Sequence, residues 1–347
     1  TRWNCDWSSD VCSSDLLFVV RDAAVNCRFC QDHWSIQIKP GLSCVAAADL
    51  VKSKTTIPLQ EEGRPAMAIR LYTDNACDLE LDYLSQLQVK VFHMPVTIQG
   101  QTYRDRLSID PPEFYRLISQ PGVVPTTAQI TPGEFQQEFE KVIAETDDDV
   151  IYIAFSSALS GTYQSACLAR DLVNPQRITV IDSKSASVGM GLTVIRAARA
   201  IAAGKDKNQV IAEIEDNIRR IQHLFIVGSF EMLKRGGRVS SASAALGNLL
   251  NIKLLLHFVD GAIVPLEKAH GFKKARKRML DIMEERGNNL ADQLIGINHS
   301  AAYESALELK GMIEERFGCR NFVISEIGAA IGAHVGAGTI SVFFLTE

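Results

Sequence analysis

A joint between a predicted strand and a predicted helix carries the side chains best suited to bind an anion. The run Val150 to Phe155 is apolar and predicts a buried strand, and the serine- and threonine-rich residues 156–166 predict the start of a helix. Such a helix turns free backbone N–H groups and the positive end of its dipole toward the end of the strand. The joint therefore predicts an anion site around Ser160 and Gly161.

Three further segments place hydrogen-bonding side chains next to one another or next to glycine, which lets a backbone approach a ligand closely. They are residues 126–129 (Thr-Thr-Ala-Gln), 234–240 (Lys-Arg-Gly-Gly-Arg-Val-Ser) and 332–338 (Gly-Ala-His-Val-Gly-Ala-Gly). The candidate ligand-binding residues in them are Thr127, with Thr126 beside it, Arg238 and His334. Hydroxyls with one arginine and one histidine, and no evident carboxylate to orient a base, suit holding an anion better than attacking an ester.

Each of these residues also has a structural explanation that needs no ligand. Ser160 would cap its own helix, worth about 1 kcal/mol, and Thr127 would be a turn residue. Arg238 would be a solvated loop cation. The glycine-rich loop around His334 offers little for a core histidine to pack against, which favours a ligand-binding role for this side chain.

The elements that position these residues alternate between strands and helices. Strands are expected over residues 69–73, 89–92, 150–155 and 178–182, with helices beginning after Asp110 and Thr131. This alternation predicts a parallel sheet covered on both faces. Ligands of such sheets lie beyond the carboxyl ends of the strands, where the sequence places Asn75 as a further candidate.

The pattern changes after residue 226. Two apolar runs flank Asp260-Gly261 and predict a hairpin. Strands over 293–298, 321–325 and 339–345, with a helix over 301–316, complete an α+β pattern. We therefore expect an α/β chain with a parallel-sheet domain over residues 67–226, an α+β domain over residues 227–347, and a ligand between the two.

The first 66 residues differ from the rest, because they hold all three Trp and five of the eight Cys. Residues 6–16 resemble a sequencing adapter that has been read as coding sequence. The codons of residues 61–64 can be almost wholly purine, as in a bacterial ribosome-binding site. We expect a non-native, disordered leader that precedes a start at Met67. The alternative is a zinc module built on Cys27, Cys30, His33 and Cys44, a weak signal without a second matched pair, so no metal is expected.

Composition narrows the function classes. A net charge of −5 and a pI of about 5.9 give no basic field, so we expect no nucleic-acid partner. No apolar run approaches the roughly 18 residues of a membrane span. Only Cys77, Cys167 and Cys319 remain after Met67, widely spaced, which fits a cytoplasmic location.

One charged segment and three missing motifs complete the survey. Residues 273–278 carry five basic side chains and predict a solvated helix face, or alternatively a transient contact with anionic membrane lipid or an acidic partner. The sequence has no phosphate loop of P-loop enzymes, no dinucleotide-binding glycine motif after the first strand and no nucleophile elbow.

Several longer motifs in a fixed order resemble the DegV family, the bacterial fatty-acid-binding proteins that include the FakB subunits. The motifs lie at residues 73–79, 155–166, 233–240, 249–253, 260–268 and 331–336, so the resemblance covers Met67 to Glu347. It implies two domains and one long-chain fatty acid, with its carboxylate near the domain junction and its tail in an apolar tunnel. In the FakB branch a separate fatty-acid kinase then phosphorylates the bound acid for phospholipid synthesis, so this chain would have no turnover of its own.

The resemblance also implies roles for individual residues. Thr127 and Ser160 correspond to the carboxylate-binding hydroxyls, and Arg238 and His334 to the cation and imidazole that complete the head-group site. Asn75 stands where the family usually has serine, and residues 127–131 lack one hydroxyl and the proline of the family motif. Two other classes stay open: an enzyme that uses His334 as phosphoryl acceptor or Ser160 as nucleophile, and a lipid-sensing regulatory protein.

Overall fold

The computed structural model describes residues 26–30, 33–37, 68–239 and 252–347. The chain divides into two compact units, residues 1–63 and residues 64–347. In the first unit, β1 (Asn26–Cys30) and β2 (His33–Gln37) form an antiparallel pair. These two strands lie within the segment that we expected to be a leader, and the start at Met67 stays a prediction. Cys44, one of the four candidate zinc ligands, lies outside the described residues.

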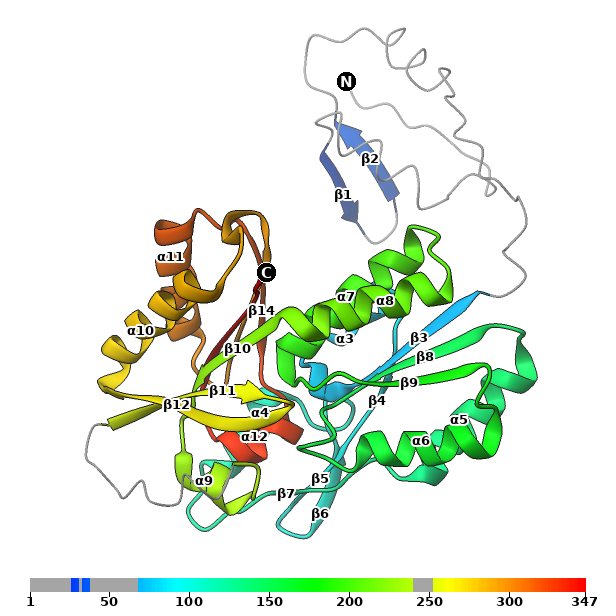
Figure 1. Cartoon of the computed structure of the whole chain (residues 1–347), viewed down its shortest axis with the longest axis horizontal. Coiled ribbons are helices and arrows are strands. Elements are labelled where there is room, and N and C mark those ends of the chain that lie inside the picture. Colours follow the sequence, from blue (N-terminus) through cyan, green and yellow to red (C-terminus); the bar gives the residue numbers. More distant parts are fainter. Residues whose placement is uncertain (1–25, 31–32, 38–67, 240–251) are drawn as a thin grey trace, which may run out of the picture. The chain divides into compact units, whose positions relative to one another are not determined.

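The second unit begins with a four-stranded sheet in the order β4-β3-β8-β9 (Figure 1). Its strands are β3 (Ile69–Asp74), β4 (Lys90–Phe92), β8 (Asp149–Ala154) and β9 (Ile178–Asp182), and every neighbouring pair is parallel. The predicted parallel sheet is therefore confirmed. All residues of β8 are buried, because both faces of this central strand are covered.

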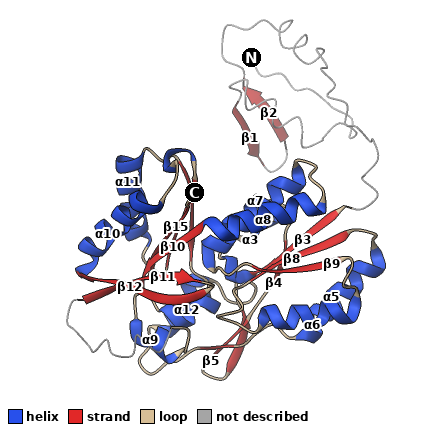
Figure 2. Cartoon of the chain, in the orientation of Figure 1, coloured by secondary structure: helices blue, strands red, loops and turns tan. Residues whose placement is uncertain are grey.

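Helices cover the two faces of this sheet (Figure 2). Tyr72 and Tyr152 face α5 (Pro132–Glu145) and α6 (Thr162–Val173), with Phe135 and Phe139 packed against them. Leu71, Ile151 and Ile153 project to the other face, toward α7 (Ser187–Ala202) and α8 (Lys207–Arg220). The period-two alternation of strand side chains thus divides the domain into two cores.

The predicted helix starts are confirmed by their capping hydrogen bonds. Asp110 accepts from the backbone N–H of Glu113 at 2.8 Å and begins α4 (Pro111–Ile118). Thr131 forms a capping box with Glu134 and begins α5. Shorter elements of this part are η1 (Asn75–Cys77), α3 (Leu81–Gln86) and an antiparallel sheet of β5 (Pro95–Ile98), β6 (Gln101–Arg104) and β7 (Thr126–Thr127).

A second, six-stranded sheet has the order β12-β11-β10-β15-β13-β14. Its strands are β10 (Ile221–Ile226), β11 (Ile252–Val259), β12 (Ala262–His270), β13 (Leu294–His299), β14 (Asn321–Glu326) and β15 (Ile340–Leu345). Only the β13–β14 pair is parallel. The predicted hairpin joins β11 to β12, and both turn residues have positive φ (Asp260 48°, Gly261 82°), as a tight hairpin turn requires.

The sheet topology corrects one expected boundary. We expected the second domain to begin at residue 227, but β10 ends at Ile226 and is paired on both sides within the second sheet. Residue periodicity identifies β10 as a strand without indicating which sheet its hydrogen bonds join. By strand pairing, the second domain therefore begins at Ile221.

The remaining helices lie around the second sheet (Figure 1). They are α9 (Phe230–Arg235), α10 (Gly271–Arg286), η3 (Leu290–Asp292), α11 (Tyr303–Phe317) and α12 (Ala329–Val335). Residues of α10 and α11 pack against Leu224, Ile297 and Val342 on one face of the sheet. The expected α/β organisation, with a parallel-sheet domain followed by an α+β domain, is confirmed.

In the part of the chain that the structure describes, no helix combines the length and the apolar character that crossing a membrane requires.

Candidate functional site

One pocket collects five of the seven residues proposed from the sequence. Thr127, Ser160, Arg238 and His334 all line it, and Gly161 lines it beside Ser160. The two domains both contribute, because Thr127 and Ser160 belong to the first domain and Arg238 and His334 to the second. The structure thus brings together four segments that are far apart in the sequence.

The Thr127 hydroxyl and the His334 imidazole are directly paired, with 2.9 Å between Oγ1 and Nε2. Thr127 lies in β7, whose partner strand β5 holds it by the pairing of Val96 with Thr127. His334 lies in the last turn of α12. The pairing therefore joins the small antiparallel sheet to the helix near the C-terminus.

His334 is held as a neutral imidazole. Burial, with a smaller contribution from the nearby Arg238 cation, lowers the pKa of His334 to about 4. Its Nδ1 atom is buried and has no hydrogen-bond partner among the described residues. Nδ1 faces Gly236 so closely that a Cβ on that glycine would lie 2.2 Å from it. The absence of a side chain at residue 236 is therefore what gives the ring its place.

Ser160 bonds within its own joint. Its Oγ lies 2.9 Å from Oγ1 of Thr162 and accepts from the backbone N–H of Thr162 at 3.2 Å. The residue that caps α6 is Gly161, which has no side chain to donate or accept. A Cβ at Gly161 would lie 1.9 Å from Oε1 of Gln129, so this glycine permits the close approach of the Gln129 side chain.

Arg238 spans the gap between the two domains. Its Nε donates to the backbone carbonyl of Leu159 at 3.1 Å, and its Nη1 donates to that of Gly236 at 2.6 Å. The guanidinium thus contacts the residue before Ser160 and the glycine that packs against His334. Because of these contacts, Ser160, Arg238, His334 and Thr127 form one contiguous group, which we call the polar cluster.

Two of the residues proposed from the sequence, Asn75 and Thr126, do not line the pocket. Asn75 does not line the pocket: its Nδ2 donates to Asp105 at 2.5 Å and its Oδ1 accepts from the backbone N–H of Met94 at 2.7 Å. Thr126 is exposed in β7 and pairs with Thr97. Both were proposed from their neighbours in the sequence. The alternation of side chains along β7 sends Thr126 away from the pocket, and the hydrogen bonds to Asp105 and Met94 hold Asn75 in η1.

Apart from the polar cluster, most of the pocket wall is apolar. Its larger contributors are Phe155, Leu159, Phe225, Phe258, Ile331 and Phe343. Three of these phenylalanines come from the second sheet, on the face opposite to α10 and α11. The pocket therefore offers a group of polar atoms together with apolar surface from both domains.

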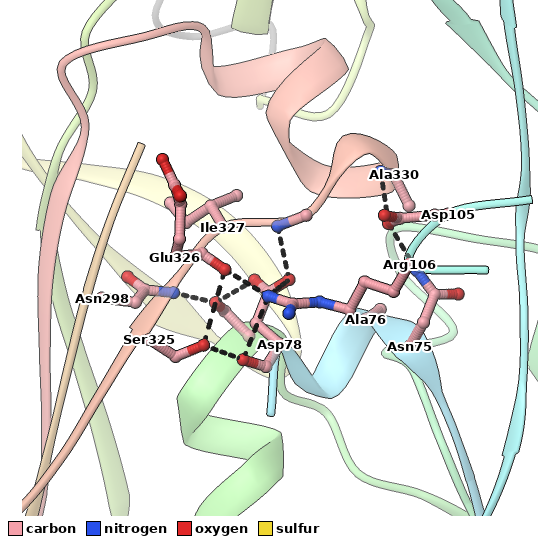
Figure 3. A network of polar contacts seen from close by, with 12 residues as sticks. Asn75, Ala76, Asp78, Asp105, Arg106, Asn298, Ser325, Glu326, Ile327 and Ala330 are labelled. Atoms are coloured by element: carbon pink, nitrogen blue, oxygen red, sulfur yellow. Dashed lines mark hydrogen bonds and ion pairs between the residues drawn. The ribbon is translucent and has the colours of Figure 1, made fainter. Parts of the chain in front are cut away.

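A buried polar network ties the domains together behind this pocket (Figure 3). Asp78 is buried and accepts from the backbone N–H of Gly328 at 2.8 Å and from the hydroxyl of Ser187. Arg106 lies 3.8 Å from Asp78 and 3.1 Å from Glu80, and it also donates to the carbonyl of Glu326. Burial raises the pKa of Asp78 to about 7, although Arg106 opposes the rise.

A second carboxylate of the network holds α12. Asp105 accepts from the backbone N–H groups of Ala329 and Ala330 at 2.9 and 2.8 Å. These are the first residues of the helix that carries His334 at its other end. Asp105 therefore helps to position His334 without contacting it.

Sequence reasoning missed several pocket residues. His223 is a packed histidine: it stacks on Phe258 with centroids 4.4 Å apart, and burial lowers its pKa to about 3. It nevertheless lines the pocket, as do Gln129, Ser187 and Asn298. Gln129 ends the segment 126–129 but was not among the proposed site residues, and no local motif marks His223, Ser187 or Asn298. Ser240 and residues 249–251, which belong to two of the motifs, lie outside the described residues.

The comparison with known families decides what kind of protein this is. The profile of the DegV family, described as an uncharacterised protein family, matches residues 68–347. The chain belongs to the DegV family. A DegV domain-containing protein of Caldanaerobacter subterraneus is 34% identical over 276 residues, which cover 80% of this chain and 98% of the relative. Protein DegV of Bacillus subtilis is 30% identical over 277 residues and covers the same shares.

Solved structures of DegV proteins have the same fold. A DegV family protein from Thermus thermophilus, described by its fatty acid binding, superposes with a TM-score of 0.74 at 33% identity, covering 81% of this chain and all (100%) of that one. DegV of Bacillus subtilis, described as a fatty acid binding protein, gives 0.72 at 30% identity with the same coverage. Among the described residues of this chain, no group of three or more His, Cys, Asp and Glu side chains could hold a metal ion.

Proposed function

We propose that this DegV protein binds one long-chain fatty acid, with the carboxylate at the polar cluster and the tail along the apolar wall. The observation that carries the proposal is the pocket itself, where Thr127, Ser160, Arg238 and His334 meet beside phenylalanine and aliphatic side chains. The fatty acid binding of the DegV proteins from Thermus thermophilus and Bacillus subtilis supports the same ligand.

A buried carboxylate needs donors, because leaving it unpaired inside the protein is costly. The Arg238 guanidinium and the hydroxyls of Thr127 and Ser160 are such donors. The neutral state of His334 helps to keep the Thr127 hydroxyl available as a donor. With its proton on Nε2 the imidazole donates to Oγ1 of Thr127, so that the Thr127 hydroxyl keeps its own hydrogen for the ligand.

The acyl tail supplies most of the affinity. Each buried methylene contributes about 0.8 kcal/mol, so a long chain against the apolar wall needs little polar recognition. The polar cluster then determines which end of the ligand lies where. This division of roles predicts weak binding of short acids, and a smaller loss of affinity for long-chain alcohols or esters, which keep the tail but lack the carboxylate.

The protein would act as a carrier and not as an enzyme. It would present the acid to a separate fatty-acid kinase in the cytoplasm, which forms the acyl-phosphate, and it would collect or release ligand in a transient contact with the membrane surface. The hydrogen bonds do not favour a hydrolase. Ser160 bonds to Thr162, whereas His334 bonds to Thr127, so the two lack the direct pairing of a nucleophile with its base.

The first experiment is native mass spectrometry of protein purified from bacteria. We expect a mass increase that corresponds to one long-chain acid per chain, and acid extraction identifies it. Protein that is empty and that also takes up neither oleate nor palmitate contradicts the proposal.

The second experiment tests the polar cluster by titration with a fluorescent fatty acid. Arg238→Ala and Ser160→Ala should each weaken binding, by about 10-fold or more for the charged group. The matched controls are Arg235→Ala, an exposed arginine three residues earlier that pairs with Glu231, and Ser119→Ala, an exposed serine at the C-cap of α4. Equal affinity in all four variants removes Arg238 and Ser160 from the site.

The third experiment separates a carrier from an enzyme. Incubation with a labelled phosphoryl donor, without any kinase, should leave the protein and its acid unlabelled. Label that is retained by the wild type and lost in His334→Ala would instead identify a phosphotransferase.

A further inference from the structure

The pocket wall formed by the second sheet carries polar residues that the carboxylate does not need. On β13 and β15, Asn298 and Ser341 are directly paired, and on β10 Phe225 pairs with the same serine. Directly paired residues project to the same face of a sheet. All three line the pocket, so an amide and a hydroxyl lie side by side among phenylalanines.

Asn298 has an unused acceptor. The residue is fully buried, with 0% of its surface exposed, and its Oδ1 has no hydrogen-bond partner among the described residues. Buried side-chain oxygens nearly always have a partner in folded proteins. An unpartnered oxygen on a residue that lines a ligand pocket points to a partner on the ligand.

The neighbouring network decides which way the amide faces. When Asp78 is ionised, above about pH 7, Ser187 donates its only hydroxyl hydrogen to that carboxylate, so the Ser187 oxygen is left to accept the bond from Nδ2 of Asn298. Figure 3 shows the Asn298 nitrogen toward this network and its oxygen on the opposite side. If the amide were reversed, Oδ1 of Asn298 would face the Ser187 oxygen, and both atoms are acceptors. The amide therefore keeps Oδ1 on the side without a hydrogen-bond partner.

We propose that Asn298 Oδ1, with the Ser341 hydroxyl beside it, is a second polar subsite that accepts a hydrogen bond from a hydroxyl group on the acyl chain. The ligand class is a monohydroxylated long-chain fatty acid. A keto or ether oxygen would not serve, since neither has a hydrogen to donate to Oδ1. The inference rests on the proposed function, because it assumes that an acyl chain occupies the pocket.

The test compares stearate with a positional series of hydroxystearates and with the corresponding ketostearates, by displacement of a fluorescent fatty acid from the full chain. One internal hydroxyl position should bind about 3- to 10-fold more tightly than stearate, the gain expected for one neutral hydrogen bond. The ketostearate of that position should bind more weakly than stearate. If stearate binds and no hydroxystearate exceeds it, the subsite is refuted and fatty-acid binding stands. If no acid binds at all, the proposed function fails.

Variants then assign the effect to Asn298. Asn298→Leu, of similar size, should abolish the preference for the hydroxyl, so that no hydroxystearate binds this variant more tightly than stearate does. Asn217→Leu is the matched control, since Asn217 is also buried and donates to Thr193 at 2.7 Å, away from the pocket. A hydroxyl preference that persists in folded Asn298→Leu overturns the assignment.

A second variant keeps the test decisive if Asn298→Leu does not fold. Ser187→Ala removes the group that orients the amide, so Asn298 can rotate and offer its N–H₂ to the ligand. The ratio of the affinity for the hydroxystearate to the affinity for the ketostearate of the same position should then fall toward 1. Discrimination unchanged from the wild type in Ser187→Ala overturns the proposed orientation.

Discussion

Gly236 packs directly against the ring of His334, so a single methyl group at this position tests how the pocket is built. A Cβ added there would lie 2.2 Å from Nδ1 of His334, well inside the 3.4 Å at which ordinary contact begins. The backbone of Gly236 is helical (φ −65°, ψ −13°), so alanine fits it without strain. The cost of Gly236→Ala must therefore come from displacing the imidazole by about 1 Å.

That displacement affects both stability and binding. Overpacking of this kind costs about 1–3 kcal/mol of the free energy of unfolding. Moving the ring also lengthens its 2.9 Å hydrogen bond with Thr127, a bond of about 0.5–1.5 kcal/mol. Affinity for a fatty acid should accordingly fall by about 2- to 10-fold, although no atom of the polar cluster has been removed.

A double-mutant cycle with His334→Ala isolates the contact. The coupling energy between the two substitutions is measured by urea unfolding and by fatty-acid titration. The four proteins compared are the wild type, the two single variants and the double variant. With the ring absent, the methyl group has nothing to displace, and Gly236→Ala should cost almost nothing. Gly311→Ala, at an open position inside α11, is the control and should stabilise by about 0.5–1 kcal/mol. An equal cost of Gly236→Ala in both backgrounds refutes the reasoning.

Three further predictions concern the domain junction and one helix start. Burial raises the pKa of Asp78 from 3.8 to about 7, so the folded protein keeps a proton that the unfolded chain releases. The stability of the wild type relative to Asp78→Asn should therefore be greatest below about pH 4 and fall as the pH rises through 7, on the order of 1.4 kcal/mol per pKa unit. Arg106→Met leaves that carboxylate without its cation and should destabilise by about 3–5 kcal/mol at pH 8. Thr131→Ala breaks the capping box with Glu134 and should cost about 1 kcal/mol at pH 8, where Glu134 is ionised.

Urea unfolding between pH 4 and pH 8 checks all three variants. A flat difference between the wild type and Asp78→Asn over this range would show that Asp78 titrates normally. A cost of Arg106→Met that disappears in the Asp78→Asn background supports the pairing, and an undiminished cost argues against it. An unchanged free energy of unfolding in Thr131→Ala at pH 8 would show that the box contributes nothing.

Features that depend on neighbouring residues could be predicted from the sequence. The helix starts at Asp110 and Thr131, the turn at Asp260-Gly261 and the buried strand β8 all follow from local hydrogen bonds or from periodicity, and the structure has each of them. Four of the polar residues of the pocket, Thr127, Ser160, Arg238 and His334, lie in segments whose hydroxyls and glycines stand out, and the family resemblance assigned them one site.

Features that depend on distant residues could not be predicted from the sequence. The sequence identifies β10 as a strand, but its partners β11 and β15 are decided by how the second sheet closes. Asn75 stands in a recognisable motif, yet its amide turns to Asp105 and away from the pocket. Nothing local marks Asn298, whose neighbours Ser187 and Asp78 lie more than a hundred residues away.

The sequence by itself thus determined the order of the elements and the residue types available to hold an anion, because backbone propensity, capping and periodicity act over a few residues. The family followed from the resemblance of its motifs. The tertiary structure alone decided which of those polar groups face one another. Thr127 meets His334 across 207 residues, and the amide of Asn298 is oriented by a serine from another domain. Such pairings arise only when two sheets pack and each buried polar atom must find a partner in the space that remains.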